Sequence, residues 1–155
     1  MGAKMEMSMS VQTPRNLNKK FASEGMKKVL WKAMVKMEEL AKMRAPVDTG
    51  MLKARIHLNP MQKGATEYTL SDGVSYGRDL EYGNRPHNVP LEPLIDWVKR
   101  KGIATDEGHQ IAFAKYVQEK IRTEGVNPHP FFRPALHEVQ FKWLPIFKKQ
   151  VFGKQ

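Results

Sequence analysis

Asp48, Thr49 and Gly50 are the residues of this 155-residue chain whose types and spacing could do chemistry. They match the catalytic tripeptide of aspartic proteases, in which two carboxylates share one proton across a dimer axis. In those enzymes the tripeptide follows an apolar strand, whereas here a lysine-rich helical segment precedes it. We therefore expect Asp48 to cap a short helical turn through Met51–Arg55 by accepting backbone N–H bonds, and not to act in catalysis.

Other reactive constellations are missing from the sequence. The chain has no cysteine, which excludes disulfides, thiolate metal sites and cysteine nucleophiles. It contains no glycine-rich phosphate loop and no nucleophile-elbow motif. The histidines lack the short paired spacings that put two imidazoles on one helix face: His57, His87, His109, His129 and His137. The sequence therefore predicts a protein that is not an enzyme and has no catalytic residue, cofactor or metal site.

The chain is strongly basic, with 26 Lys and Arg against 16 Asp and Glu and a net charge of +10. Most of the excess falls in the first 44 residues. A basic surface suits a polyanion or an acidic protein. Lys28, Lys32 and Lys36 are the candidate DNA-facing residues. The alternative is a solvated outer face, because glutamates are interleaved with these lysines.

The elements that must position these residues follow from the apolar spacing. Residues 1–18 show neither helical nor strand periodicity, so we interpret them as a flexible or partner-ordered arm. Residues 19–155 then form a single domain. A long amphipathic helix is predicted at 20–44, where Pro46 prevents its continuation. Its apolar stripe comprises Met26, Val29, Leu30, Ala33, Met37, Leu40 and Ala41.

The remaining patterns complete an α+β fold. Strand-like runs within residues 56–76 predict a small antiparallel β-sheet of about three strands, the last at Val74–Tyr76. We expect this sheet to pack against the long N-terminal helix and further helices. Pro145 should kink or break the last helix. The further helices are expected at about 91–101, 111–123 and 134–150.

Two pairs of large apolar side chains point away from the predicted core stripes. Trp31 and Val35 are four residues apart among the lysines of the first helix. Phe141 and Phe152 lie off the stripe of the last helix. Isolated apolar residues are normal on protein surfaces, but such pairs also mark subunit contacts. These four residues are therefore the candidate subunit interface.

Three segments of the chain, in order, resemble the neck and tail-completion proteins of tailed bacteriophages. Those are minor structural proteins at the head–tail junction of long-tailed, lambdoid-type phages. The helical segments between the second and third blocks are also similar to an insert common in that family, so the resemblance covers about residues 20–140. The blocks are Ala45-Pro46-Val47-Asp48-Thr49-Gly50-Met51-Leu52-Lys53 through Ile56, Tyr76-Gly77 through Glu81-Tyr82-Gly83, and Pro128-His129-Pro130-Phe131-Phe132-Arg133-Pro134-Ala135-Leu136.

The residue types in each block also suit a particular local structure. Asp48 and Gly50 fix a tight helix entry, and the two glycines of the second block permit a close turn. The prolines of the third block hold its phenylalanines rigidly for packing. Arg133 is expected to pair with Glu81 or Asp48, and the sequence does not choose between them. The fold-defining set is Asp48, Thr49, Gly50, Tyr76, Gly77, Glu81, Tyr82, Gly83, Pro130, Phe131, Arg133 and Pro134.

The resemblance implies a virion structural protein without catalysis. It implies a homo-oligomeric ring between head-closure or neck proteins and tail-terminator or tail-tube proteins, with non-specific contacts to the DNA that passes through. No run approaches the roughly 18 apolar residues of a membrane span, and the opening residues lack the apolar stretch of a signal peptide. We therefore expect assembly in the host cytoplasm and no membrane partner. The alternative function is a free, non-specific DNA-binding protein that uses the basic N-terminal helix.

Overall fold

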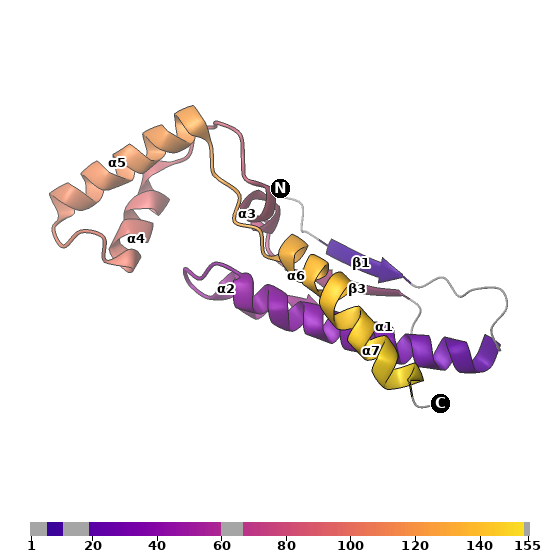
Figure 1. Cartoon of the computed structure of the whole chain (residues 1–155). Coiled ribbons are helices and arrows are strands. Elements are labelled where there is room, and N and C mark those ends of the chain that lie inside the picture. Colours follow the sequence, from indigo (N-terminus) through magenta and orange to yellow (C-terminus); the bar gives the residue numbers. More distant parts are fainter. Residues whose placement is uncertain (1–5, 11–18, 60–66, 154–155) are drawn as a thin grey trace.

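The computed structural model describes residues 6–10, 19–59 and 67–153, and it confirms the α+β class. A small sheet packs with a long N-terminal helix and further helices (Figure 1). None of the described helices is both long and apolar enough to cross a membrane. The elements are β1 (Glu6–Ser10), α1 (Lys19–Arg44), α2 (Met51–Arg55), β2 (His57–Leu58), β3 (Glu67–Ser71), α3 (Gly77–Tyr82), α4 (Leu91–Lys101), α5 (Glu107–Glu124), α6 (Phe132–Glu138), the π-helical turn η2 (Val139–Trp143) and α7 (Leu144–Phe152).

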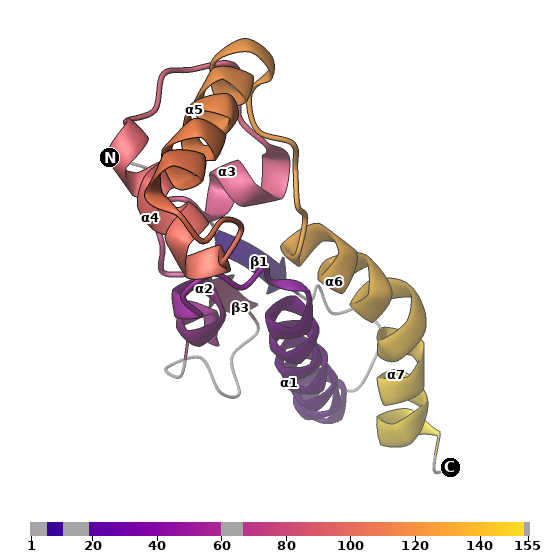
Figure 2. The same cartoon turned by 90° about the vertical axis from the view of Figure 1, so that its left-hand side faces the viewer.

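Helix α1 lies between the sheet on one side and the α6–η2–α7 segment on another (Figures 1 and 2). The predicted apolar stripe is buried except for Met26, which is half-buried, and Met34 joins it. Trp31 was predicted to point away from the core, but its ring packs against buried Tyr68 of β3 with centroids 5.6 Å apart. A helix that is covered on two sides buries more than one stripe, which explains these additions.

The sheet has the strand order β1-β3-β2, with both pairings antiparallel. Two expectations are corrected here. The third strand is β1, within the segment predicted to be an arm without secondary structure, and the rest of that arm lies outside the described residues. Residues 6–10 alternate methionine with polar residues, which is the period of a strand. Val74–Tyr76 forms no strand, because the chain turns at Asp72 and then enters α3.

The turn into α3 depends on a close approach between Asp72 and Gly77. Asp72 is fully buried, and its Oδ1 accepts a hydrogen bond from the backbone N–H of Val74 at 3.3 Å. A Cβ on Gly77 would lie 1.6 Å from the other carboxylate oxygen of Asp72. Gly77, expected to permit a close turn, instead follows the turn at residues 75–76 and begins a helix that the sequence did not predict.

The C-terminal helix is interrupted just before Pro145, as predicted. Five residues, Val139–Trp143, form a π-helical turn, and the N–H of Leu144 donates to the carbonyl of Val139. A proline has no N–H for the helix ladder, and a wider turn accommodates this loss. Ile146 is 41% exposed, whereas Leu144 and Phe147 pack at the edge of the core.

Helices α4 and α5 form a hairpin that projects from the body (Figures 1 and 2). Val98 and Ala114 are buried in it. Helix α5 begins at Glu107, earlier than predicted, because Asp106 caps it by accepting the N–H of His109 at 3.0 Å. The hairpin therefore has its own small apolar contact and stands apart from the main core cluster.

We expect Gly77→Ala to lower the free energy of unfolding by about 1–3 kcal/mol, because the new methyl group overlaps the buried carboxylate of Asp72. Urea denaturation followed by circular dichroism measures the change. In an Asp72→Ser background, which keeps an acceptor for Val74 but removes the second oxygen, Gly77→Ala should cost less. Equal costs in the two backgrounds would show that this contact does not matter.

Candidate functional site

The buried carboxylate of Glu81, on α3, joins the second and third sequence blocks. Its Oε2 accepts hydrogen bonds from the backbone N–H groups of Phe131 at 2.7 Å and Phe132 at 2.9 Å. Its Oε1 accepts the N–H of Arg133 at 2.8 Å. These are N–H groups at the start of α6, which no side chain of its own N-terminus caps. Glu81 therefore acts as the N-cap of a helix fifty residues away in the chain.

Arg133 pairs with Glu81 and not with Asp48, which resolves the choice that the sequence left open. Its Nε donates to Glu81 Oε1 at 3.0 Å, and its Nη2 donates to the backbone carbonyl of Glu81 at 2.7 Å. The guanidinium also lies 4.6 Å from the centre of the Tyr82 ring. A cation beside a buried carboxylate offsets the cost of removing that charge from water.

The aromatic residues of the third block are held as expected. Phe131 and Phe132 are fully buried, with ring centroids 4.7 Å apart. Pro134 lies in the first turn of α6, where a missing N–H costs nothing. Exposed Pro130 precedes the pair, and the N–H of His129 donates to the carbonyl of Leu80 at 2.7 Å. Gly83, with φ 75°, ends α3 beside this segment.

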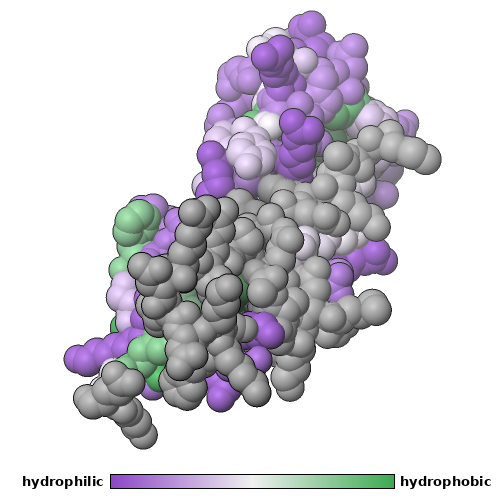
Figure 3. All heavy atoms as spheres, turned by 90° about the vertical axis from the view of Figure 1, so that its right-hand side faces the viewer, coloured by the Kyte–Doolittle hydropathy of each residue, from purple (hydrophilic) through white to green (hydrophobic). Residues whose placement is uncertain are grey.

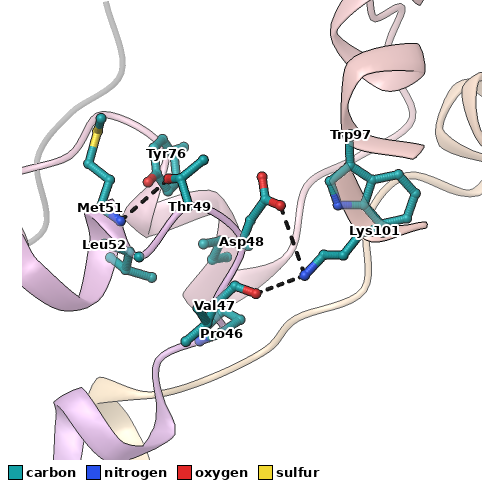
Figure 4. Close-up of a pocket in the computed structure, with 11 residues that line it drawn as sticks. Pro46, Val47, Asp48, Thr49, Met51, Leu52, Tyr76, Trp97 and Lys101 are labelled. Carbon is teal, nitrogen blue, oxygen red and sulfur yellow. Dashed lines mark hydrogen bonds and ion pairs between the residues drawn. The ribbon is translucent and has the colours of Figure 1, made fainter. Parts of the chain in front are cut away.

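The first block lines a cleft of about 510 Å³ between the loop after α1, helix α3 and helix α4 (Figure 4). Its walls are mainly apolar. Trp97 and Lys101 of α4 face Asp48 across the opening (Figure 4). Tyr76 and Leu80 bring the second block to the same cleft, so all three blocks meet around α3. The lining residues are Pro46, Val47, Asp48, Thr49, Gly50, Met51, Leu52, Tyr76, Leu80, Trp97 and Lys101.

Asp48 does not cap α2, contrary to the sequence-based prediction. Gly50 is the N-cap residue at φ 81°, and the hydroxyl of Thr49 accepts the N–H of Met51 at 3.4 Å. The carboxylate of Asp48 instead lies 2.9 Å from Arg100 and 3.9 Å from Lys101. The left-handed turn at Gly50 directs Asp48 away from the helix that it precedes. Asp48 therefore ties the projecting hairpin to the body, and cations surround it where a protease dyad has a second carboxylate.

The candidate interface pair on α1 lines a shallow groove of about 290 Å³ between α1 and α7. Val35 is 43% exposed, as expected for an interface residue, whereas Trp31 is half-buried. Phe147 of α7 forms the opposite wall. We call this feature the α1–α7 groove. Its lining residues are Trp31, Lys32, Val35, Lys36, Glu39 and Phe147.

The two residues of the second candidate pair, Phe141 and Phe152, have different surroundings in the structure. Phe141 is 70% exposed, and its ring contacts that of His137 with centroids 4.6 Å apart. Phe152 is half-buried over Gly25 of α1, where a Cβ would lie 2.5 Å from its ring. Phe152 therefore fills a gap within its own chain, because α7 folds back along α1. Of the two, Phe141 keeps the exposure that a subunit contact requires.

The candidate DNA-facing lysines have different surroundings. Lys28 is exposed. Lys32 donates to Gln150 at 3.1 Å, and Lys36 pairs with both oxygens of Glu39 at 2.9 Å. The ammonium of Lys36 also lies 4.4 Å from the centre of the Trp143 ring. Two of the three lysines are thus held beside the α1–α7 groove by their own chain.

Glu138 is a residue that the sequence reasoning missed. Its carboxylate lies 2.5 Å from Nη2 of Arg44 at the end of α1 and accepts the indole N–H of Trp143 at 3.0 Å. The hydrogen bond from Trp143, and next the one from Arg44, lower the pKa of this carboxyl from 4.5 to about 2. Trp143 lies five positions after Glu138 in the chain, a spacing that a π-helical turn brings together. Glu138 thus ties the C-terminal segment to α1.

The described residues contain no group of three or more His, Asp or Glu side chains that could hold a metal ion.

We expect Glu81→Ala to lower the free energy of unfolding by roughly 3–5 kcal/mol, because it leaves buried N–H groups and Arg133 without their acceptor. Glu81→Gln should cost less, since one oxygen remains. Urea denaturation measures both. Glu124→Ala is a matched control: this exposed residue lies 3.9 Å from Lys120, and its loss should change stability by within about 0.5 kcal/mol. A Glu81→Ala effect as small as that of the control would refute the capping role.

Stability should fall in acid through protonation of Glu138. Because the pKa is lowered in the folded state, the carboxylate stabilises the fold above about pH 4.5, and this contribution is lost as the pH falls toward 2. Urea midpoints measured across this range should fall more for the wild type than for Glu138→Gln. Trp143→Phe keeps the ring but removes the N–H donor, so the pKa of Glu138 in the folded state should move back toward 4.5. Its stability should therefore fall over a narrower pH range than that of the wild type. Identical pH profiles for the three proteins would contradict this assignment.

Protein-family models, curated proteins and solved structures give no match to this chain. The resemblance to neck and tail-completion proteins therefore depends on the three sequence blocks. In the fold these blocks meet around α3, through Glu81 on one side and the cleft on the other. Together the blocks hold α3, the start of α6 and the loop after α1 in place relative to one another.

Proposed function

We propose that this protein is a structural component of the head–tail junction of a tailed bacteriophage, of the neck or tail-completion class. Copies associate into a ring that connects head-closure proteins to the tail and lets DNA pass. The protein acts in the virion through its shape and surfaces and transforms no substrate. The ordered sequence blocks, which meet around α3, support this class.

The observation that carries the proposal is the exposure of large apolar side chains at separate places on a well-packed body. Val35 is 43% exposed beside the α1–α7 groove, Phe141 70% on η2 and Tyr116 61% on the projecting hairpin. Figure 3 shows one face of the molecule, on which green apolar patches at the α7 end interrupt a largely hydrophilic described surface. Rings form through heterologous contacts, which require two different surfaces on each copy. A chain with separate apolar surfaces satisfies that requirement.

The basic character of the chain fits the passage of DNA. Lysine and arginine side chains neutralise phosphates without reading the base sequence. A ring multiplies the charge of +10 per copy around one channel. A channel of that kind holds the genome electrostatically while allowing it to move.

The alternative, a free DNA-binding protein, has weaker support. Lys32 and Lys36 stand beside an apolar groove floor of Trp31 and Val35, which offers nothing to a phosphate backbone. On this basis the isolated subunit binds duplex DNA feebly. The alternative would require tight binding that falls by about 0.9 log unit per log unit of salt for each phosphate contacted.

Assembly of the purified chain tests the proposal. We expect concentration-dependent oligomers by sedimentation and rings with a central opening by electron microscopy. Val35→Gln combined with Phe141→Gln should raise the concentration needed for assembly by about tenfold or more, because each substitution removes apolar contact area. Met43→Gln is the matched control, since Met43 is 70% exposed on the same helix but lines neither the groove nor the cleft.

A chain that stays monomeric at every concentration, and that is absent from neck-containing phage particles, would contradict the proposed function. Salt-sensitive DNA binding by the free subunit would favour the alternative.

A further inference from the structure

The α1–α7 groove combines an apolar floor with a basic rim. Trp31, Val35 and Phe147 supply the apolar surface, and Lys32 and Lys36 stand on the rim four residues apart. Glu39 is the one acidic residue among those lining it, and Lys36 neutralises it. Exposed lysines lie on both flanking helices, at Lys28 on α1 and at Lys148 and Lys149 on α7. The chemistry that fits this groove is an apolar segment that carries carboxylates.

The first turns of α4 have that chemistry. Glu92 and Asp96 are exposed and four residues apart, the same spacing as Lys32 and Lys36, so each pair lies on one helix face. Neither carboxylate pairs with a cation within the described part of the chain. Half-buried Leu91 and Ile95 lie beside them. The acidic character ends one turn later, where Arg100 pairs with Asp48.

These two surfaces cannot meet within one molecule. The α4–α5 hairpin projects from the end of the body that carries α2, whereas α7 runs toward the opposite end (Figures 1 and 2). A contact between them therefore joins two copies. Such a contact is heterologous, because each copy offers its hairpin on one side and its groove on the other.

We infer that the first turns of α4 in one copy bind the α1–α7 groove of the next copy, with Glu92 and Asp96 facing Lys32 and Lys36. This inference rests on the proposed ring and names the contact that builds it. A second copy fits better than nucleic acid, because the floor of the groove is apolar and phosphates gain nothing from Trp31 or Val35. Complementary charges at this spacing fix the register of the two helices.

Charge exchange tests the inference directly. Lys32→Glu with Lys36→Glu gives a chain that is acidic on both surfaces, and Glu92→Lys with Asp96→Lys gives one that is basic on both. Each double variant alone should need at least about tenfold more protein to assemble, because like charges then face each other. An equimolar mixture of the two should recover association near the wild-type level. Lys53→Glu with Lys115→Glu, an equal charge change at exposed sites elsewhere, should have no effect. Circular dichroism and urea midpoints verify that all variants fold.

Cross-linking maps the same contact, since the chain has no native cysteine. Val35→Cys lies in the groove, and Asn88→Cys lies just before α4. A short bismaleimide should join the two variants when they are mixed and should not dimerise either one alone. Cross-linked Val35→Cys homodimers would overturn the inference, because the groove would then meet itself.

The failure of this inference differs from the failure of the proposed function. If the wild type forms rings and the charge variants assemble equally well, the groove contact is wrong while the ring stands. If the wild type stays monomeric, both are wrong. Loss of duplex DNA binding in Lys32→Glu with Lys36→Glu, with assembly unchanged, would assign the groove to nucleic acid and overturn the inference.

Discussion

The buried carboxylate of Glu81 is the interaction on which the rest of the structure depends. It accepts three backbone N–H groups at the start of α6 and pairs with Arg133, so it caps a helix from a distant part of the chain. A buried charge is costly unless hydrogen bonds and an opposite charge satisfy it, and here four N–H groups donate to the carboxylate. Its placement fixes where α3 lies, and α3 in turn forms one wall of the cleft and the base of the projecting hairpin.

Around Glu81 the molecule divides into a packed body and the projecting α4–α5 hairpin. In the body, α1 is covered by the sheet and by the α6–η2–α7 segment, which gives it a continuous apolar core. The π-helical turn lets the last helix pass Pro145, and Glu138 then ties it to Arg44. The hairpin has only a small apolar contact of its own and is attached through Asp48 and a few backbone bonds. A rigid body with a projecting element is a suitable form for a subunit that joins its neighbours.

The surfaces that remain exposed are consistent with assembly. The groove between α1 and α7 is apolar and basic, whereas the exposed face of α4 begins with two carboxylates that pair with no cation among the described residues. Val35 of the groove and both carboxylates of α4 stay exposed in a single copy. Apolar and charged groups that a monomer leaves unused have a physical explanation when a second copy covers them.

The sequence by itself determined the α+β class, the long helix at its predicted position, the helices of the hairpin and the interruption at Pro145. These features depend on apolar period and on proline and glycine, which act locally. Only the tertiary structure decided that Glu81 is the partner of Arg133, that Asp48 pairs with Arg100, that β1 completes the sheet and that Phe152 covers Gly25. Each of these depends on residues far apart in the chain, and short-range patterns carry no information about which distant groups meet.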